Sequence, residues 1–561
     1  MTVAERLKRL GLRPDRMRPA RLWYGLRRPV YATPLYHLIL SGRTPKRLAA
    51  SPPDPWPGDP ERGRAILAGE YDLAGEYDLA GESRRGRGDI WSRTGGAGAG
   101  LDALHGFAWL GDLRAVGTDD ARRRARELVA GWIGRFGRWN AVAWRPDVLG
   151  RRVTAWLTHH DFFCASADDA FRARFFGSLA RQARHLARAT PSGDEGVRLL
   201  LAIKGIIYSG ACLPGEAARL ARGLRLLDRE LNRQIRPDGG HHQRSPSVHL
   251  AVLRHLIDIR ATLVAARQEA PGGLQTAIDR MVPMLRFFRH GDGGLALFNN
   301  TCEEETGLID RVLFQADARG RPPSSAPHTG FERLAAGRTV VIAEVGAPSA
   351  PGIDDDNHAG TLSFEMSVGE ERLVVNCGAY AGRDPKWRAV PRTTAAHSTV
   401  VVGDTNSSEI LPDGTIGRRP DRVTCRRGES DGNIWIDASH DGYLEDLGVI
   451  HRRRLYLGAD GDDFRGEDTL TGPGGQDFAV RFHLHPAVQV SPVQAGEAAL
   501  LRLPGGAGWR FQASGGRLGV SEDVYLGVRG KIKRSEQIVV TGSIQGGEAV
   551  IKWAFRRIGR P

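Results

Sequence analysis

The sequence predicts an α+β protein with at least two domains, in which a helical domain comes first and a large antiparallel β-sandwich follows. The chain has 561 residues, whereas single domains usually contain roughly 100–200 residues. Apolar residues recur at helical spacing from Leu101 to about Arg289. Near Gly330 the period falls from about 3.6 residues to about 2, which marks the change from helix to strand.

Residues 1–60 precede the helical region and are predicted to form an irregular basic arm. They are rich in arginine and proline, most densely between Pro52 and Pro60. Proline lacks a backbone donor and disfavours regular elements. We therefore expect this arm to pack on another part of the protein.

The helical domain is predicted over residues 61–325. Leu128, Trp132 and Phe136 follow the helical period. The segment Val197–Tyr208 is apolar on nearly every side, which is typical of an inner helix in a layered helical assembly. Short breakers such as Pro214-Gly215 separate the helices.

The strand domain is predicted over residues 326–561. Thr339–Val345 is rich in β-branched residues, and apolar residues alternate from Leu362 to Val368. Fragments separated near residues 320–335 should therefore give mainly helical circular dichroism for the first and mainly strand for the second. Further strands are predicted at Leu373–Cys377, Ser398–Val402, Asn433–Ala438, Arg454–Leu457, Phe478–Leu484 and Ile538–Ile544.

The formal net charge of +14 comes almost entirely from arginine. Guanidinium groups bind carboxylate, sulfate and phosphate, so the charge fits an anionic polymer, either an acidic polysaccharide or a nucleic acid. A basic motif interleaved with aromatic residues is missing from the sequence, so no specific nucleic-acid partner is expected.

The five cysteines are widely scattered and contain no CxxC pair. This spacing predicts buried free thiols rather than a disulfide framework or a cysteine-based zinc site. No apolar run approaches the about 18 residues of a transmembrane helix, and no signal peptide is recognisable.

Polar residues that could take part in catalysis or binding are concentrated in two glycine-rich loops. The stretch from Pro237 to His249 reads PDGGHHQRSPSVH and enters a predicted helix, where anions are favoured. A similar turn, Arg289–Leu295, contains His290. The alternative is that these are ordinary capped turns with solvated histidines.

A second group of polar residues lies at predicted strand ends. His358 precedes one strand, and His397 precedes another. Both are candidates for catalysis or metal binding, although strand-end histidines are often structural. Arg481, His483 and His485 share one face of a strand because alternate residues point the same way. That face is expected either to line a cleft or to be solvated.

Several enzyme classes lose support because their motifs are missing. The sequence contains no GxxxxGK phosphate loop, no GxSxG elbow and no HExxH helix. The sequence therefore does not favour an NTPase, a serine hydrolase or a zincin.

Taken together, several segments resemble the heparinase II/III family, and their order matches over roughly residues 60–555. The resemblance implies an (α/α) helical toroid followed by an antiparallel β-sandwich, and lyase chemistry on an acidic, uronate-containing polysaccharide such as alginate or a glycosaminoglycan. The segments are Leu104–Leu113, Trp144–Trp156, Pro237–His241, Arg289–Gly293, His358–Phe364, Asn376–Tyr380 and Arg392–His397.

Lyases of this type work by β-elimination. A base removes the proton beside the uronate carboxylate, cations stabilise the resulting anion, and an acid protonates the departing oxygen. The resemblance implies proton-transfer roles for His241 or His242, Tyr380 and His397. It implies substrate-binding roles for Arg244, His290, Arg388 and Arg392.

The sequence departs from the family pattern at several positions. Val248 stands where the family usually has a tyrosine acid/base, and the run Asp356–Gly360 retains only His358. His358 and His397 match the family's zinc positions, but Asn376 replaces the aspartate and is a weaker ligand. We therefore expect no required cofactor and weak or no stoichiometric zinc at this set.

Two main functions remain open, with non-specific nucleic-acid binding through the arginine surface as a third. The first is a polysaccharide lyase that cleaves an acidic polysaccharide by β-elimination. The alternative is a catalytically impaired binding or scaffolding protein of the cell envelope, motivated by Val248 and Gly360. Family analogy favours the envelope or periplasm, while the lack of a signal peptide leaves the cytoplasm open.

Overall fold

The computed structural model describes residues 19–70, 90–93, 99–380, 385–493 and 497–559. The chain forms two compact units. We call the first, residues 1–234 and 251–278, the helical unit, and the second, residues 235–250 and 279–561, the sandwich unit. Among the described residues, none of the helices combines the length and apolar character that crossing a membrane requires.

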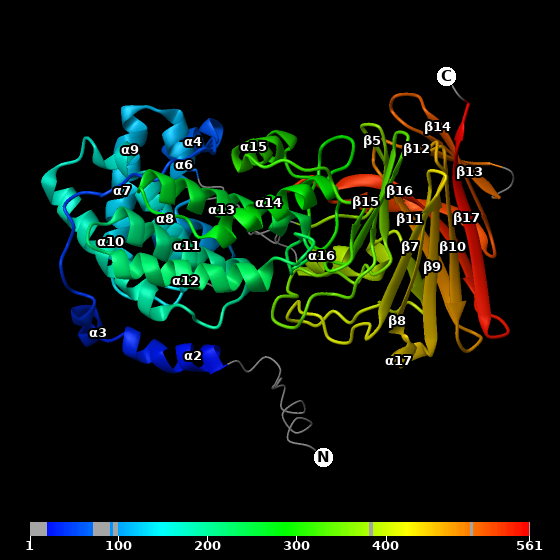
Figure 1. The fold of residues 1–561 in the computed structure, drawn as a ribbon, viewed down its shortest axis with the longest axis horizontal. Coiled ribbons are helices and arrows are strands. Elements are labelled where there is room, and N and C mark those ends of the chain that lie inside the picture. Colours follow the sequence, from blue (N-terminus) through cyan, green and yellow to red (C-terminus); the bar gives the residue numbers. More distant parts are fainter. Residues whose placement is uncertain (1–18, 71–89, 94–98, 381–384, 494–496, 560–561) are drawn as a thin grey trace, which may run out of the picture. The chain divides into compact units, whose positions relative to one another are not determined.

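The helical unit is built of layered helices (Figure 1). Helices α13 (Pro246–Ala265) and α14 (Gly272–Phe287) each run from one unit into the other. The remaining α-helices of this unit are α2 (Pro19–Tyr31), α3 (Pro34–Ile39), α4 (Pro60–Leu67), α5 (Ala99–Gly106), α6 (Leu110–Val116), α7 (Asp119–Phe136), α8 (Pro146–Thr158), α9 (His160–Cys164), α10 (Asp169–Ala189), α11 (Gly196–Cys212) and α12 (Ala217–Gln234).

Helix α11 is the inner helix that the apolar run predicted. Its residues are buried almost throughout, and it packs against α8 and α12. Gly150 of α8 makes the close approach to α11 possible, because a Cβ atom there would lie 2.2 Å from the carbonyl oxygen of Leu201. The prediction of an inner helix is confirmed.

The described part of the N-terminal arm contains two helices, α2 and α3, and continues without regular structure from residue 41 to residue 59. Thr33 caps α3 by accepting a hydrogen bond from the backbone N–H of Tyr36, and Pro34 occupies the first turn, where it needs no donor. Helix α2 is amphipathic and exposes Leu22, Trp23 and Leu26. The proline-rich composition concealed these helices because proline is tolerated at a helix start.

The sandwich unit contains two antiparallel sheets in its described residues. The first sheet has the order β1-β2-β3-β4-β5-β11-β16-β15, with β6 paired to β11. Its strands are β1 (Ser325–Ala326), β2 (Phe331–Ala336), β3 (Thr339–Glu344), β4 (Phe364–Val368), β5 (Glu371–Val375), β6 (Val400–Val402), β11 (Asp477–Leu484), β15 (Arg517–Tyr525) and β16 (Lys533–Ser543).

The second sheet has the order β12-β13-β14-β17-β10-β9-β8-β7. Helices α15 (Thr306–Ala316), α16 (Pro385–Ala389) and α17 (Leu444–Leu447) also belong to this unit. The strands of the second sheet are β7 (Val423–Ser430), β8 (Asn433–Tyr443), β9 (Val449–Leu457), β10 (Asp463–Thr471), β12 (Gln489–Val493), β13 (Ala498–Arg502), β14 (Gly508–Ser514) and β17 (Glu548–Ile558).

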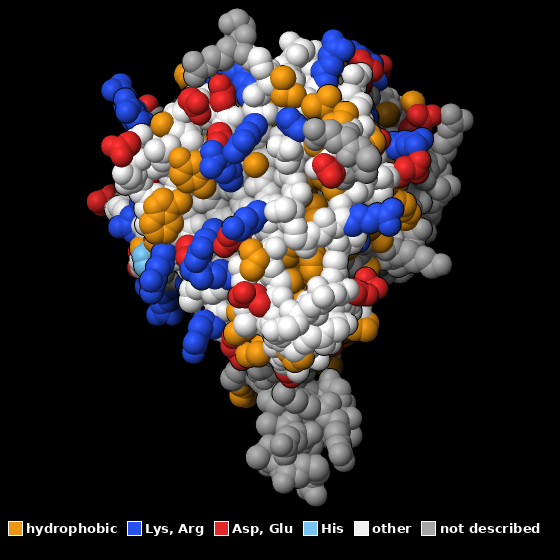
Figure 2. Space-filling view, turned by 90° about the vertical axis from the view of Figure 1, so that its right-hand side faces the viewer, with side chains coloured by type: hydrophobic (Ala, Val, Ile, Leu, Met, Phe, Trp, Pro, Cys, Tyr) orange, Lys and Arg blue, Asp and Glu red, His pale blue; other side chains and the backbone are white. Residues whose placement is uncertain are grey.

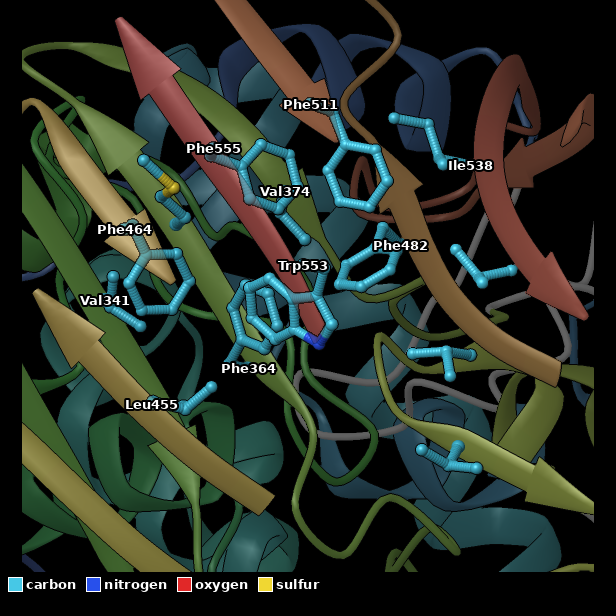
Figure 3. Packing of buried hydrophobic residues seen from close by; sticks show 14 of the residues in the cluster. Val341, Phe364, Val374, Leu455, Phe464, Phe482, Phe511, Ile538, Trp553 and Phe555 are labelled. Carbon is cyan, nitrogen blue, oxygen red and sulfur yellow. The ribbon is translucent and has the colours of Figure 1, made fainter. Parts of the chain in front are cut away.

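The core of the sandwich lies between the two sheets. Figure 3 shows Phe364, Phe464, Phe482 and Trp553 converging from both sheets. The rings of Phe364 and Trp553 stack with their centroids 5.5 Å apart. Burying a large apolar side chain stabilises a fold by roughly 1.5–3 kcal/mol. The predicted order of a helical region followed by an antiparallel sandwich is confirmed.

The compact units divide the chain differently from the expected boundary at residues 325 and 326. Residues 235–250 and 279–325 belong to the sandwich unit, although they precede its sheets in sequence. Leu297 shows the physical reason, because it is fully buried in a small cluster with Val375 and Tyr525. Periodicity finds elements, but it does not reveal which unit a loop packs against.

Candidate functional site

A glycine turn begins the loop that carries the predicted histidines. Asp238 accepts hydrogen bonds from the backbone N–H of Thr329 at 2.7 Å and from its hydroxyl at 2.6 Å. Gly239 has a φ of +88°, which favours glycine. A side chain at Gly240 would collide with Thr329. Hydrogen bonds therefore hold the loop against Thr329, in the segment that leads into the first sheet.

Arg244 is the main link between this loop and the sheet. Its guanidinium donates to the carbonyl oxygens of Thr329, Gly330 and Ala347 and forms an ion pair with Glu344 at 3.0 Å. Burial lowers the pKa of Arg244 and raises that of Glu344, and each charge opposes the other's shift. The donors of Arg244 are thus directed at the protein itself.

Asparagine side chains complete the connection. Asn299 donates to the carbonyl oxygen of Arg244 at 3.1 Å and accepts from the backbone N–H of His358 at 3.1 Å. Asn357 donates to the carbonyl oxygen of Gln243 at 3.0 Å. The structure therefore brings the glycine loop and the His358 strand end together in one buried junction. The sequence contained no signal that marked Asn299.

His358 and His397 form a continuous hydrogen-bond chain in this junction. The backbone N–H of Asn300 donates to Nε2 of His358 at 3.0 Å, so the proton of that ring lies on Nδ1. Nδ1 of His358 lies 3.2 Å from Nε2 of His397, whose Nδ1 lies 2.7 Å from the carbonyl oxygen of Thr393. All four ring nitrogens have partners when both rings are neutral.

The pKa shifts agree with this neutral pair. Burial lowers the pKa of His358 well below its ordinary value and lowers that of His397 to about 4. Both side chains are almost fully buried. At neutral pH the pair therefore carries no charge.

The metal positions implied by the family do not fit a metal ion in this chain. The ring nitrogens of His358 and His397 are occupied, as described above. Asn376 uses its side-chain oxygen to accept the backbone N–H of Ser398 at 3.0 Å. A Cβ atom at Gly360 would lie 2.7 Å from the ring of His397. The set is packed as a structural cluster.

The histidines of the glycine loop are also buried. The rings of His241 and His242 pack edge to face with centroids 4.7 Å apart. Burial, more than the neighbouring charges, lowers the pKa of His241 well below its ordinary value. Val248, at the family's tyrosine position, is buried too. The catalytic roles of His241 and His242 stay predictions.

The other predicted residues lie in varied surroundings within the sandwich unit. His290 contacts Ser367 at 2.9 Å and Glu365 at 3.0 Å through its two ring nitrogens. Arg392 donates to the carbonyl oxygens of Asn357 and Gly414. Tyr380 is half-buried and Arg388 is exposed. Arg388 and Tyr380 are thus the more accessible members of the predicted set.

A groove on the outward face of the second sheet was not predicted. It encloses about 690 Å³, and Gly466 and Ala554 are among the residues that line it. Trp435, Tyr456 and Arg465 lie side by side because they are register partners on β8, β9 and β10. The ring of Trp435 covers Gly428, where any Cβ atom would collide with it. In the sequence, only the alternation of side chains along each strand could have indicated this groove.

Basic side chains border this groove. Figure 2 shows lysine and arginine side chains over this face, interspersed with acidic and apolar ones. Arg454, Arg465 and Lys552 are at least half exposed, at 50%, 51% and 67%. Glu467 lies between Arg454 and Lys552. Cationic and aromatic groups therefore remain accessible to a ligand.

The helical unit contains a polar cavity of about 260 Å³ lined by residues of α8, α11 and α13. Asp258 accepts hydrogen bonds from Trp56 and Lys204, both at 2.6 Å. Arg254 lies over the ring of Trp56 at 4.8 Å. The carboxylate is thus occupied by internal partners.

A helical toroid followed by an antiparallel sandwich, with a junction rich in histidine and arginine, defines a polysaccharide-lyase-like class of protein. Residues 134–316 match the model of the heparinase II/III N-terminus, and residues 318–554 match that of the heparinase II/III-like C-terminal domain. The chain belongs to the heparinase II/III family.

Solved structures agree on the fold. A crystal structure of heparinase III superposes with a TM-score of 0.74 at 14% identity, covering 98% of this chain and 92% of that one. Heparan sulfate lyase HepC from Pedobacter heparinus gives a TM-score of 0.61 at 16% identity, covering 94% and 88%. The predicted toroid and sandwich are confirmed.

Two relatives were found among characterised proteins. FtsZ-localized protein C from Caulobacter vibrioides is 32% identical over 587 residues, which cover 98% of each chain. Heparin-sulfate lyase from Bacteroides stercoris is 28% identical over 177 residues, which cover 30% of this chain and 25% of that protein. The similarity to the first relative thus spans almost the whole chain.

Proposed function

We propose that this chain is a member of the heparinase II/III family that binds an acidic polysaccharide without cleaving it. The observation that carries the proposal is the hydrogen-bond chain through His358 and His397, in which every ring nitrogen has a partner. A general acid or base must come within hydrogen-bond reach of the proton it transfers. A substrate could contact the ring nitrogens of His358 and His397 only after their buried hydrogen bonds had been broken.

The surroundings of the other predicted residues support the same conclusion. Arg244 and Arg392 direct their donors at backbone carbonyls, so they are not free to hold a substrate carboxylate. Val248 offers no proton where the family usually has a tyrosine. A protein that binds the polysaccharide without cleaving it needs neither free arginines in this junction nor a tyrosine at the position of Val248.

The groove on the second sheet is the surface that we assign to the polysaccharide. Guanidinium groups of Arg454 and Arg465 suit carboxylates and sulfates, and Lys552 adds a third cation. Trp435 and Tyr456 offer flat rings against which the apolar face of a sugar can pack. An open groove on a sheet also accommodates a polymer that continues in both directions.

Binding is tested with alginate and heparan sulfate as separate probes at low and moderate salt. Arg454→Ala combined with Lys552→Ala should weaken binding at least tenfold and reduce its salt dependence, because two cationic contacts are lost. Arg517→Ala removes an exposed arginine from β15 of the other sheet and serves as the matched control. Equal binding by wild type and the double variant would remove the groove from the proposal.

Lyase activity is the competing function and has a direct readout. Each β-elimination leaves an unsaturated uronate, which absorbs in the ultraviolet. We expect no increase in absorbance when the protein is incubated with either polysaccharide. Sustained release of unsaturated product, lost in His397→Ala, would instead establish the lyase.

The relative from Caulobacter vibrioides is named for its localisation with FtsZ. We propose that this chain also localises with FtsZ, since the two proteins share 32% identity over almost their full lengths. A fluorescent fusion expressed with labelled FtsZ should show coincident signals. A fusion that stays diffuse while FtsZ is assembled would contradict this part of the proposal.

A further inference from the structure

Three potential metal ligands converge in the first sheet of the sandwich unit. Cys377 follows β5, His483 lies in β11, and Asp523 lies in β15. The Cys377 sulfur lies 3.5 Å from Nδ1 of His483 and 3.8 Å from Oδ1 of Asp523. Nδ1 of His483 lies 2.6 Å from Oδ2 of Asp523. One ligand atom from each residue lies within 4.8 Å of the other two.

The sheet's topology brings these residues together. His483 pairs with Val375, two residues before Cys377. A bridge between Gly378 and Leu526 places the chain after β5 beside the end of β15. Phe482 and Leu484 point into the core, so His483 points to the opposite face. All three donors therefore meet on the side of the sheet away from the core.

Two groups approach the same nitrogen in this cluster. Nδ1 of His483 has one position for a proton or a lone pair, yet both the sulfur of Cys377 and the carboxylate of Asp523 approach it. Cys377 and His483 are 2% and 1% exposed, so these contacts are made away from solvent.

The arrangement does not fit a nucleophilic triad. In a Cys-His-Asp relay the thiol and the carboxylate contact opposite nitrogens of the imidazole. Here both approach Nδ1, so the ring cannot pass a proton from one to the other. Convergence on a single nitrogen is the geometry of a shared central ion.

We propose that Cys377, His483 and Asp523 form a zinc site. Thiolate, imidazole and carboxylate are the ligands of zinc, with bonds of about 2.0–2.3 Å. Tetrahedral angles at those bond lengths separate the donor atoms by roughly 3.4–3.6 Å. The distances from sulfur to Nδ1 of His483 and to Oδ1 of Asp523 agree with this separation within about 0.2 Å. The other carboxylate oxygen of Asp523, Oδ2, must move away from Nδ1 when the ion binds. Water completes the fourth position.

Charge balance supports a dication at this place. Binding releases the thiol proton of Cys377, while Asp523 binds as the carboxylate and the proton of the His483 ring remains on Nε2. The ion, one thiolate and one carboxylate then sum to zero net charge. A neutral site is compatible with burial, whereas an unbalanced charge is costly there. The side chain of Asp523 retains 7% exposure.

This site is separate from the positions that the family resemblance implied. The expectation of weak or absent zinc concerned His358, His397 and Asn376, whose ring nitrogens and side-chain oxygen are engaged in hydrogen bonds of their own. Cys377 follows Asn376 directly, but it belongs to a different set of partners. The two sets make opposite predictions for the same variants.

The experiment measures zinc in the purified full-length protein and then cobalt in its place. We expect about one zinc per chain, and cobalt should produce the near-ultraviolet band of a thiolate ligand. Cys377→Ser and Asp523→Asn should each lower zinc affinity at least tenfold and change or abolish that band. Cys302→Ser is the matched control, because Cys302 is also a buried free thiol beside Leu526.

His358→Gln separates this site from the family's position and should retain zinc. Protein without zinc that also shows no thiolate band with cobalt would overturn the proposal. So would zinc that is lost in His358→Gln and retained in Cys377→Ser. The cobalt band of the wild-type protein gives an answer even where a variant fails to fold.

Discussion

His397 is expected to contribute to stability in a pH-dependent way. Burial lowers its pKa from 6.5 to about 4 in the folded protein. Below pH 6.5 the imidazole of His397 therefore binds a proton in the unfolded chain but not in the folded protein. The free energy of unfolding should fall by about 1.4 kcal/mol per pH unit for this residue between pH 6.5 and about 4. Above pH 6.5 the contribution is constant.

Urea unfolding of His397→Ala across this range tests the expectation. The variant should lose about 1–3 kcal/mol at pH 8, because His358 loses its acceptor, and its acid dependence should be shallower than that of wild type. His328→Ala, which removes an exposed histidine, is the control. If the variant were as stable as wild type at every pH, the buried hydrogen bonds of His358 and His397 would not stabilise the fold.

Stability measurements can also test whether Arg244 supports the fold through its ion pair with Glu344. Arg244→Ala leaves the buried carboxylate of Glu344 without its ion-pair partner. Breaking a buried pair from one side typically costs about 3–5 kcal/mol. Adding Glu344→Gln should recover part of that loss, since it removes the stranded charge and keeps a partner for Asn299.

Chemical denaturation of the single and double variants provides the measurement. Arg517→Ala should change the free energy of unfolding by less than about 0.5 kcal/mol, as exposed substitutions usually do. A double variant that is less stable than Arg244→Ala would contradict the assigned role of the ion pair.

At the scale of elements, the contact between α8 and α11 depends on Gly150. An added Cβ atom would lie 2.2 Å from the carbonyl oxygen of Leu201 and 2.9 Å from Cα of Ala202. Backbone atoms cannot move aside as a flexible side chain does. Gly150→Ala should therefore lower the free energy of unfolding by about 1–3 kcal/mol despite alanine's higher helix propensity.

Gly134 in α7 is the matched control, because nothing lies within 4 Å of its added Cβ atom. Gly134→Ala should raise stability by up to about 1 kcal/mol through helix propensity alone. Thermal unfolding followed by far-ultraviolet circular dichroism measures both effects. If the two substitutions shift the transition in the same direction, the close helix contact is not a constraint.

At the scale of the whole molecule, the structure changes the expected behaviour of fragments. Residues 279–325 belong to the sandwich unit, and His290 and the backbone N–H of Leu297 both contact the buried carboxylate of Glu365. A fragment of residues 326–561 would leave that carboxylate and the surrounding core exposed. We expect it to lack a cooperative thermal transition, and residues 279–561 to have one.

Circular dichroism melting of the two fragments decides between these outcomes. Both should contain strand, so the shape of the transition is the relevant observable rather than the spectrum. A cooperative transition of residues 326–561 near the temperature of the full chain would place the domain boundary where periodicity suggested.

Much of the fold followed from local patterns. Apolar periodicity located α11, and alternation located strands such as β4 and β11, because each depends on residues close in sequence. The order of motifs identified the family. Turn residues such as Gly239 marked the glycine loop correctly, since only local backbone geometry requires them.

The sequence by itself therefore determined the class of the protein, the order of its parts and the segments that meet in the junction. Only the tertiary structure decided what those segments do there. Whether His397 has a free nitrogen depends on His358, 39 residues away. Likewise, Cys377 and His483 are 106 residues apart in the sequence, and His483 and Asp523 are 40 residues apart. Hydrogen bonds and metal sites depend on distances and directions in space, and sequence spacing does not specify those.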